Sequence, residues 1–247
     1  MIRMKSALVL AYLLLDITSY IEIAKTQIEP IRQLAFQQEK PPIPGRPPER
    51  EPAGTRGPCE ETKTPFTPLL PVTSTETKFS GFTLTGHPTF WFYVPYQASS
   101  VSSGKFSLED RQGNPVYQTS FKLPNTPGFI SVSIPATEKN LEKNKLYRWT
   151  FSLSCASIDS SEPPPVWHTG TVQRVDMPAL KTQLKTATLE ERINLYVKNK
   201  IWYDASTDLA KIHNSPQAWL NLLKATDLEQ LNQAAIAGSV VPIEGGN

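Results

Sequence analysis

The segment that most constrains the fold is Tyr147–Cys155, where apolar and polar residues alternate without interruption. One side of the extended chain would carry Tyr147, Trp149, Phe151, Leu153 and Cys155, and the other Arg148, Thr150, Ser152 and Ser154. Successive side chains of a β-strand point to opposite faces, so the pattern is typical of a strand with one buried and one solvated face. The segment is therefore predicted to be a central strand of a β-sandwich.

Other short runs of strand-forming residues are separated by turn residues rich in Gly, Pro and Asn. They are Thr67–Val72, Phe79–Thr85, Pro88–Tyr96, Lys105–Asp110, Val116–Leu123, Phe129–Ile134 and Val166–Val175. Many short strands with regular turn signals predict an antiparallel immunoglobulin- or fibronectin-III-like β-sandwich over residues 66–176. Pro88–Tyr96 is apolar on both faces, so we expect this strand to be central and covered on both sides.

A local spacing adds detail to the predicted sandwich. Leu141 lies six residues before Tyr147, in the turn that leads into the alternating strand. This arrangement resembles the tyrosine corner of fibronectin-type sandwiches, in which the Tyr hydroxyl bonds to backbone a few residues upstream. The alternative is that Tyr147 is an aromatic residue at the edge of the core. Both interpretations remain open from the sequence.

The hydrophobic period changes from two to that of a helix after Pro178. A helix is expected after Thr188 as its N-cap, with Lys198 and Lys200 near its other end. Further helices are expected over residues 202–213, 216–225 and 227–237, where Gly238 ends the last one. The fold class is thus mainly β with an α-helical C-terminal tail, a small helical hairpin region over residues 177–238. Residues 239–247 are expected to be a disordered tail.

The N-terminal region suggests export. Arg3 and Lys5 precede an apolar run, Ala7–Leu15, which is the layout of a signal peptide, although no clear cleavage triplet follows. Residues 1–24 are interpreted as a cleaved signal peptide, an uncleaved N-terminal anchor or a plain amphipathic helix. The first two place the rest of the chain in the periplasm or cell envelope. Residues 25–65 are rich in Pro, which favours an extended segment.

The chain has two cysteines, Cys59 and Cys155. An even number of cysteines in an exported chain predicts a disulfide. Two buried free thiols are the alternative, because free Cys is often simply a core residue. A bond between them would fasten the Pro-rich segment to the sandwich.

Composition and motifs do not point to catalysis. The net charge is +2 and the pI about 8.4, without the basic stripe of a nucleic-acid-binding protein. The histidines are His87, His168 and His213, and their spacing predicts no metal site. No GxSxG or phosphate-binding glycine loop occurs. We expect no enzyme activity, no cofactor and no metal, although a hydrolase with a pair of acids distant in sequence stays open.

Two groups of residues could serve recognition. Arg46, Arg50 and Arg56 lie in the Pro-rich segment, where they either form a docking strip or salt-bridge the segment to its own domain. The other group is the aromatic set Trp91, Tyr93 and Tyr96, which could bind sugar rings if exposed, or pack in the core beneath the helical tail.

Several blocks of sequence carry a family resemblance. They read REPAGTRGPC, PTFWFYVPY, GNPVYQTSF, TPGFISVSIP, LEKNKLYRWTFSLSC and IWYDASTDLA. In combination they are similar to the cyanobacterial family called domain of unknown function 928, over about residues 42–223. The resemblance implies an exported protein without an assigned activity and brings no catalytic residues. The chain departs from the family at Lys200, where a Gly usually precedes Ile-Trp-Tyr-Asp.

Together these observations predict a non-catalytic exported cell-envelope protein that acts as a protein-interaction or structural module. Its partner would be another envelope protein, and it would touch the membrane only through an uncleaved N-terminal anchor. The alternative function is a carbohydrate-binding module for peptidoglycan or exopolysaccharide. A hydrolase with an unrecognised site is the third hypothesis.

Overall fold

The computed structural model describes residues 59, 61–73, 78–156, 164–207 and 212–243. The chain divides into two units, residues 1–46 and 47–247, and every described residue belongs to the second. The predicted signal peptide or anchor, and most of the predicted Pro-rich segment, lie outside the described residues.

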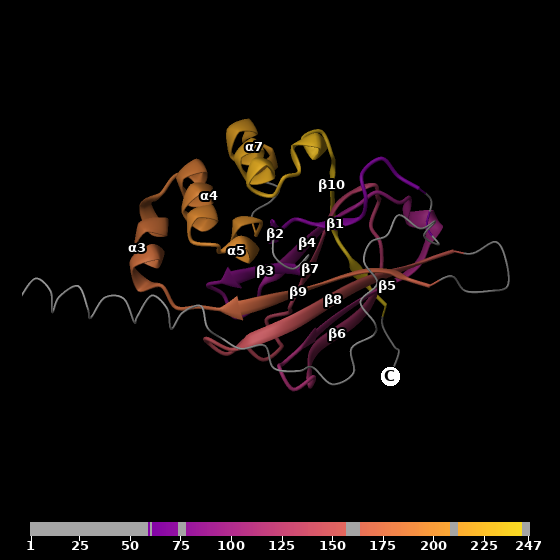
Figure 1. Ribbon diagram of the computed structural model, residues 1–247, viewed down its shortest axis with the longest axis horizontal. Helices are drawn as coiled ribbons and strands as arrows, with labels where there is room; N and C mark the ends of the chain where they lie inside the picture. The colour runs from indigo at the N-terminus through magenta and orange to yellow at the C-terminus, as the bar shows by residue number, and fades with distance from the viewer. Residues whose placement is uncertain (1–58, 60, 74–77, 157–163, 208–211, 244–247) are drawn as a thin grey trace, which may run out of the picture. The chain divides into compact units, whose positions relative to one another are not determined.

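Two β-sheets form the body of the second unit (Figure 1). One sheet has four strands in the order β1 (Thr67–Pro68), β4 (Thr89–Val94), β7 (Gly128–Ser133) and β10 (Ile236–Ser239). The other has seven strands in the order β11 (Val241–Pro242), β6 (Pro115–Lys122), β5 (Val101–Glu109), β8 (Leu146–Cys155), β9 (Val166–Arg174), β3 (Lys78–Thr83) and β2 (Val72–Thr73). A single turn of 3-10 helix, η1 (Ala98–Ser100), precedes β5. The prediction of a mainly β chain is confirmed.

Strand β8 lies at the centre of the seven-stranded sheet, between β5 and β9. Its buried and partly exposed residues alternate along the whole strand, as the sequence predicted. Trp149, Phe151 and Leu153 are fully buried between the two sheets. There they meet inward-facing aromatics of the four-stranded sheet, with the rings of Phe92 and Phe151 4.2 Å apart.

The four-stranded sheet is covered on both faces, as expected for the doubly apolar segment at β4. Phe90, Phe92 and Val94 face the core between the sheets and are buried. Trp91 and Tyr93 lie on the other face, where they pack against a second apolar cluster that includes helical residues. Strand β7 follows the same rule, and all its residues except Ser133 are buried.

The strand pairing differs from the predicted purely antiparallel sandwich, and this prediction is wrong for two pairs. Strand β3 pairs with β9 in parallel, and β7 pairs with β10 in parallel. A parallel pair needs a long crossover connection, which the intervening strands and helices provide in both cases. The described residues therefore form two mixed sheets rather than purely antiparallel ones.

Helices follow the last long strand and lie over the four-stranded sheet (Figure 1). They are α3 (Pro178–Thr186), α4 (Leu189–Lys198), α5 (Trp202–Ala205) and α7 (Pro216–Ala225), followed by the 3-10 turn η2 (Glu229–Leu231). Thr188 caps α4 as predicted, because its side chain accepts from the amide of Glu191 while the Glu191 carboxylate accepts from the amide of Thr188. Trp219 of α7 packs on Phe129 of β7, with ring centroids 5.3 Å apart.

The predicted helix over Asp227–Ala237 is wrong. Asp227 has a positive φ of 57°, and only the short turn η2 follows before the chain becomes strand β10. Residues 239–243, expected to be disordered, complete β10 and form β11, which pairs with the edge strand β6. The chain end thus contributes a strand to each sheet, and residues 244–247 lie outside the described residues.

Candidate functional site

The short helix α5 fixes the helical layer to the two sheets. Its Tyr203 side chain is fully buried in the core between the sheets, where its ring contacts Phe90 at 5.0 Å. The hydroxyl accepts a hydrogen bond from Nε1 of Trp149 at 2.6 Å and donates one to the carbonyl of Thr171 at 2.8 Å. Burial raises the pKa of Tyr203, so the hydroxyl stays protonated and can donate.

The neighbours of Tyr203 add two more contacts with strand β3. Trp202 packs on Gly81, where a Cβ atom would come within 2.9 Å of the indole Cδ1, so the close approach requires glycine. The Asp204 carboxylate accepts from the amide of Leu84 at 3.0 Å, just beyond the end of β3. Burial raises the pKa of Asp204, while hydrogen bonds from Thr83 and from the Leu84 amide oppose this shift. Three consecutive residues therefore hold one helix in a fixed position.

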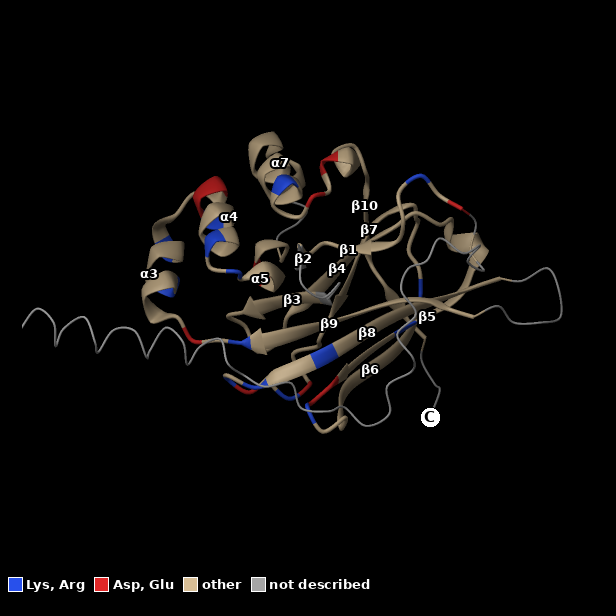
Figure 2. Ribbon diagram, viewed as in Figure 1, with Lys and Arg blue, Asp and Glu red and all other residues tan. Residues whose placement is uncertain are grey.

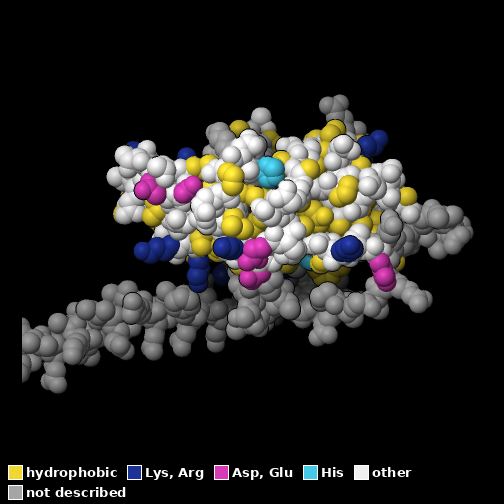
Figure 3. Space-filling model, turned by 90° about the horizontal axis from the view of Figure 1, so that it is seen from above, with side chains coloured by type: hydrophobic (Ala, Val, Ile, Leu, Met, Phe, Trp, Pro, Cys, Tyr) yellow, Lys and Arg dark blue, Asp and Glu magenta, His cyan; other side chains and the backbone are white. Residues whose placement is uncertain are grey.

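A broad groove of about 710 Å³ opens where α3 and α4 meet the ends of β3 and β9. Its lining includes the cationic side chains Arg174, Lys181, Lys185 and Arg192. Figure 2 shows the Lys and Arg positions on α3, on α4 and at the end of β9. Viewed onto the helical side, Lys and Arg side chains gather at the end of the unit that carries these helices (Figure 3). Leu84, Leu184 and Tyr196 belong to the same lining and provide its apolar part.

The carboxylates near the groove are already engaged with the protein. Asp176 forms ion pairs with Lys143 at 2.6 Å and with Lys181 at 2.9 Å, and these bonds lower its pKa to about 2. The Asp204 carboxylate is directed at the backbone amide of Leu84, as described above. The guanidinium of Arg174 donates through Nη1 to the carbonyl of Leu141, and within the described chain neither Arg174 nor Lys185 pairs with an acid. The groove is therefore cationic.

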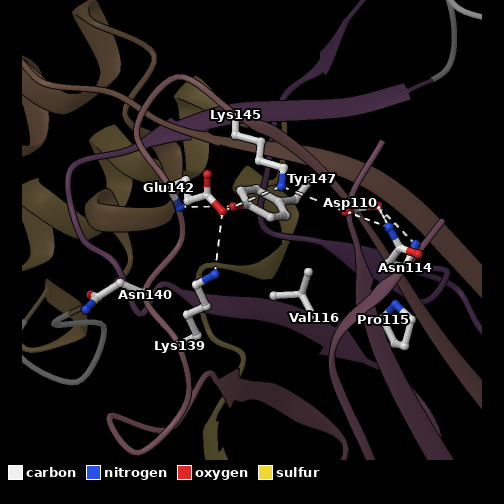
Figure 4. Close-up of a pocket in the computed structure, with 9 residues that line it drawn as sticks. All are labelled: Asp110, Asn114, Pro115, Val116, Lys139, Asn140, Glu142, Lys145 and Tyr147. Atoms are coloured by element: carbon white, nitrogen blue, oxygen red, sulfur yellow. Dashed lines mark hydrogen bonds and ion pairs between the residues drawn. The ribbon is translucent and has the colours of Figure 1, made fainter. Parts of the chain in front are cut away.

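A second, smaller hollow of about 220 Å³ lies at the loop before β8 (Figure 4). Lys145 contacts Glu142 at 3.6 Å and Asp110 at 3.8 Å, and Lys139 contacts the same Glu142 at 3.8 Å. Asn114 bonds to both oxygens of Asp110, and this bond is the main cause of the lowered pKa of Asp110. Each charged side chain that lines this hollow has a partner in the neighbouring loops. These ion pairs and hydrogen bonds connect the turn at Asp110 to the loop before β8.

The tyrosine of the predicted corner lines this same hollow. The amide of Glu142 donates to the Tyr147 hydroxyl at 2.9 Å, five residues upstream of the tyrosine. Leu141 is fully buried, and its amide donates to the carbonyl of Gly86 at 2.9 Å. The two residues thus fix the turn that enters β8.

The other residues singled out in the sequence take separate positions. Cys59 and Cys155 form a disulfide with their Cα atoms 5.4 Å apart. Cys155 ends β8 in the seven-stranded sheet, and Cys59 precedes β1 of the four-stranded sheet, so the bond fastens the segment before β1 to the end of β8. Arg46, Arg50 and Arg56 lie outside the described residues.

The aromatic residues proposed for sugar binding are all partly buried. Trp91 and Tyr93 face the helical layer, and Tyr93 packs on Phe129 at 5.5 Å. Tyr96 packs against the core between the sheets, and this burial raises its pKa. A different aromatic residue is exposed: Trp167 of β9, with 42% of its surface accessible. Its place opposite Ser152 puts it on the outer face of the seven-stranded sheet.

Sequence reasoning missed Trp167 and the groove for different reasons. Strand parity could have found Trp167, because it lies five positions before the buried Val172, and an odd offset puts two side chains of a strand on opposite faces. The cationic groove had no local signal, because its lining comes from segments around residues 84–87, 140, 174, 181–196 and 204.

No three His, Cys, Asp or Glu side chains lie together as a metal site within the described part of the chain. The same residues include no helix that is long and apolar enough to span a membrane. The three histidines serve separate contacts. His87 bonds to the carbonyl of Glu138, His168 to that of Phe66, and His213 packs on Trp219.

Comparison with protein families gives one match. The model of the Domain of Unknown Function family DUF928 matches residues 51–236, about three quarters of the chain. The chain belongs to the DUF928 family. The matched range of DUF928 includes both sheets up to the start of β10, the disulfide and all the helices. Comparisons with curated proteins and with solved structures find no match.

Lys200 stands where members of the DUF928 family usually have a Gly, and its backbone conformation is unusual for a lysine. Its φ is +59°, a left-handed conformation that glycine adopts without steric cost. The carbonyl of Lys200 accepts from the amide of Phe82 at 2.9 Å, so the conformation is fixed by strand β3. The turn before α5 is therefore held in place despite the lysine.

Proposed function

We propose that this DUF928 chain is an exported, non-catalytic cell-envelope protein that acts as a protein-interaction module. The observation that supports this most is the cationic groove, which is lined by α3, α4 and strand ends and lies next to α5, the helix attached to the strands by Trp202, Tyr203 and Asp204. A recognition surface formed by several rigid elements loses little conformational entropy on binding. The disulfide is consistent with an oxidising compartment such as the periplasm.

The test compares partner capture by matched variants. The full chain, expressed in its native host, would be cross-linked in the envelope fraction and purified as wild type, as Lys185→Glu and as Lys224→Glu. Both lysines are exposed and lie in the last turn of their helices, α3 and α7, but only Lys185 lines the groove. We expect at least one partner to be captured by wild type and Lys224→Glu and lost with Lys185→Glu. A partner set that is identical for all three proteins would contradict a role for the groove.

Trp167 supports a second candidate, binding to peptidoglycan or exopolysaccharide. The outer face around it carries hydroxyl side chains, including Ser152, Thr150 and Thr169. An exposed indole beside hydroxyl groups can stack on a sugar ring while the ring hydroxyls form hydrogen bonds. Sedimentation with insoluble envelope glycan should then fall for Trp167→Ala and persist for Trp167→Tyr, and equal sedimentation of all forms would exclude this site.

A further inference from the structure

The cationic groove at α3 and α4 has properties that specify its ligand beyond charge alone. Lys181 is paired with Asp176, and Arg192 already interacts within the chain. Arg174 donates through one guanidinium nitrogen to the carbonyl of Leu141. The guanidinium has five N–H donors, so others remain for a ligand. Lys185 has no acid partner within the described chain. The charge that a ligand can meet is thus centred on Arg174 and Lys185.

The groove is broad and open, and this excludes a single small anion as a strong ligand. Ion pairs that stay in contact with water contribute only about 0–1 kcal/mol each, so several contacts are needed for affinity. Arg174 and Lys185 come from different elements, the end of β9 and the last turn of α3. A ligand that meets both must carry two or more carboxylates or similar groups along an extended chain.

Apolar side chains line the same groove as the cations. Leu84 and Leu184 are partly exposed, and both also pack against the apolar cluster beneath the helices. A polyphosphate or a uronic acid polymer would leave these leucines without an apolar partner. An extended peptide that alternates acidic and aliphatic residues would cover them while its carboxylates meet Arg174 and Lys185.

We propose that the groove binds an acidic peptide segment of the partner protein, with aliphatic side chains between its carboxylates. This proposal rests on the proposed function as a protein-interaction module and names the chemistry of the partner at that site. Arg174 supplies bidentate recognition of one carboxylate, and Lys185 supplies a second, more adjustable charge. Leu84 and Leu184 select for the aliphatic residues between them.

The test uses the purified, oxidised protein and a labelled peptide in which Glu and Leu alternate. We expect saturable binding that weakens as salt is raised, because exposed charges are screened. The peptide with Gln in place of Glu should not bind. Lys185→Glu should weaken binding by about tenfold or more, because a charge opposite the ligand is reversed, whereas Lys224→Glu should change it less than about twofold.

Two further measurements separate the proposal from its alternatives. Leu184→Gln, a change on the groove wall that leaves the charges intact, should weaken peptide binding severalfold but leave binding of polygalacturonate unchanged. Equal affinity for polygalacturonate and the Glu–Leu peptide, or equal effects of Lys185→Glu and Lys224→Glu, would overturn the proposal in favour of unspecific polyanion attraction.

Loss of a cross-linked partner with Lys185→Glu, combined with failure of every acidic peptide to bind, would overturn the acidic-peptide proposal and leave the interaction role intact. Peptide binding without any groove-dependent cross-linked partner would instead count against the proposed function alone.

Discussion

The outer faces of the two sheets differ in what covers them, and the difference is visible in the sequences of β4 and β8. On the four-stranded sheet, β4 is apolar on both faces. In β7 the face of Phe129, which packs on Trp219 of the helical layer, also carries Ser131, yet Ser131 is buried too. On the seven-stranded sheet, β8 alternates strictly, and its outer face carries Ser, Thr and Arg. The composition of β4 therefore indicates two covered faces before any partner element is known, whereas the alternating sequence of β7 does not.

The same comparison shows how the two sheets are held together. At one point, the disulfide joins the end of β8 to the segment leading into β1. At another, Tyr203 reaches from the helical layer into the core between the sheets and bonds to Trp149 and Thr171 of the seven-stranded sheet. The helical layer thus contacts both sheets, although it covers only one. The predictions below test these attachments in order of expected effect.

Removal of the disulfide should have the largest effect. The double variant Cys59→Ser, Cys155→Ser frees two positions 96 residues apart. Because the bond restricts the unfolded chain, its loss should lower the free energy of unfolding by about 4 kcal/mol. Urea denaturation of the purified variant checks this, with reduced wild-type protein as the control. A loss below about 1 kcal/mol would mean that the sheets associate without help from the covalent link.

Tyr203→Phe should have the next largest effect. The variant keeps the ring but removes the hydroxyl, which leaves Nε1 of Trp149 and the carbonyl of Thr171 buried without this partner. We expect a loss of about 2 kcal/mol in the free energy of unfolding, since unsatisfied buried polar groups are costly.

Tyr147→Phe is the matched control for Tyr203→Phe. It removes a tyrosine hydroxyl with a single partner, the partly buried amide of Glu142, and should cost less, about 1 kcal/mol. Equal losses for the two variants would contradict the view that Tyr203 is the main attachment of the helical layer.

The pH dependence of stability should report on His168, which faces the core from the seven-stranded sheet. Its ring bonds to the carbonyl of Phe66 and packs on Phe66 and Phe79, and burial lowers its pKa. The unfolded chain therefore binds a proton more readily than the folded one, so stability is complete above the ordinary His pKa of about 6.5 and falls as the pH is lowered through it.

His168→Gln provides the measurement, because its amide can donate to the same carbonyl but does not titrate in this range. Unfolding free energies of wild type and variant should run parallel above pH 7 and diverge below it, by at most about 1.4 kcal/mol per pH unit. If the two free-energy curves stayed parallel down to pH 5, His168 would have the same pKa in the folded and the unfolded chain, and its burial would not lower that pKa. Other groups with shifted pKa values, such as Asp176 and Asp204, are present in both proteins and cancel in the difference.

Local patterns in the sequence predicted the strands well, because the order of apolar and polar residues along a strand indicates which of its side chains are buried. Tyr147–Cys155, Pro88–Tyr96 and the helix capped by Thr188 all occur as expected. The parallel pairing of β3 with β9 was not predictable, because the choice of neighbour depends on contacts between segments distant in sequence. The helix predicted over residues 227–237 does not form, although Leu228 and Leu231 have helical spacing. Both leucines pack in the apolar cluster beneath the helices, and the chain then pairs with β7 as strand β10.

The candidate site was less predictable than the fold for the same physical reason. Each cation of the groove looks like an ordinary surface residue in its own segment, and only the folded chain brings the end of β9 together with α3 and α4 in one groove. The aromatic side chains of Trp91 and Tyr93 suggested a sugar-binding site in the sequence. In the structure they pack beneath the helices instead. Conversely, Trp167 stands out only when the parity of its strand is known.

Lys200→Gly is predicted to have the smallest effect and the opposite sign. Lys200 has a φ of +59° and precedes α5, so it lies where the helical layer meets strand β3. A non-glycine residue in this conformation costs roughly 1–2 kcal/mol, and glycine offsets part of that gain by the greater entropy of its unfolded chain. The net result should be a stabilisation of about 0.5–1 kcal/mol, measured by urea denaturation. Lys198→Gly, at the last residue of α4 two residues earlier, is the control and should destabilise instead, by up to about 1 kcal/mol. If Lys200→Gly also destabilised the protein, the turn would owe its conformation to contacts of the lysine side chain, and the link between the helical layer and the covered sheet would depend on more than α5.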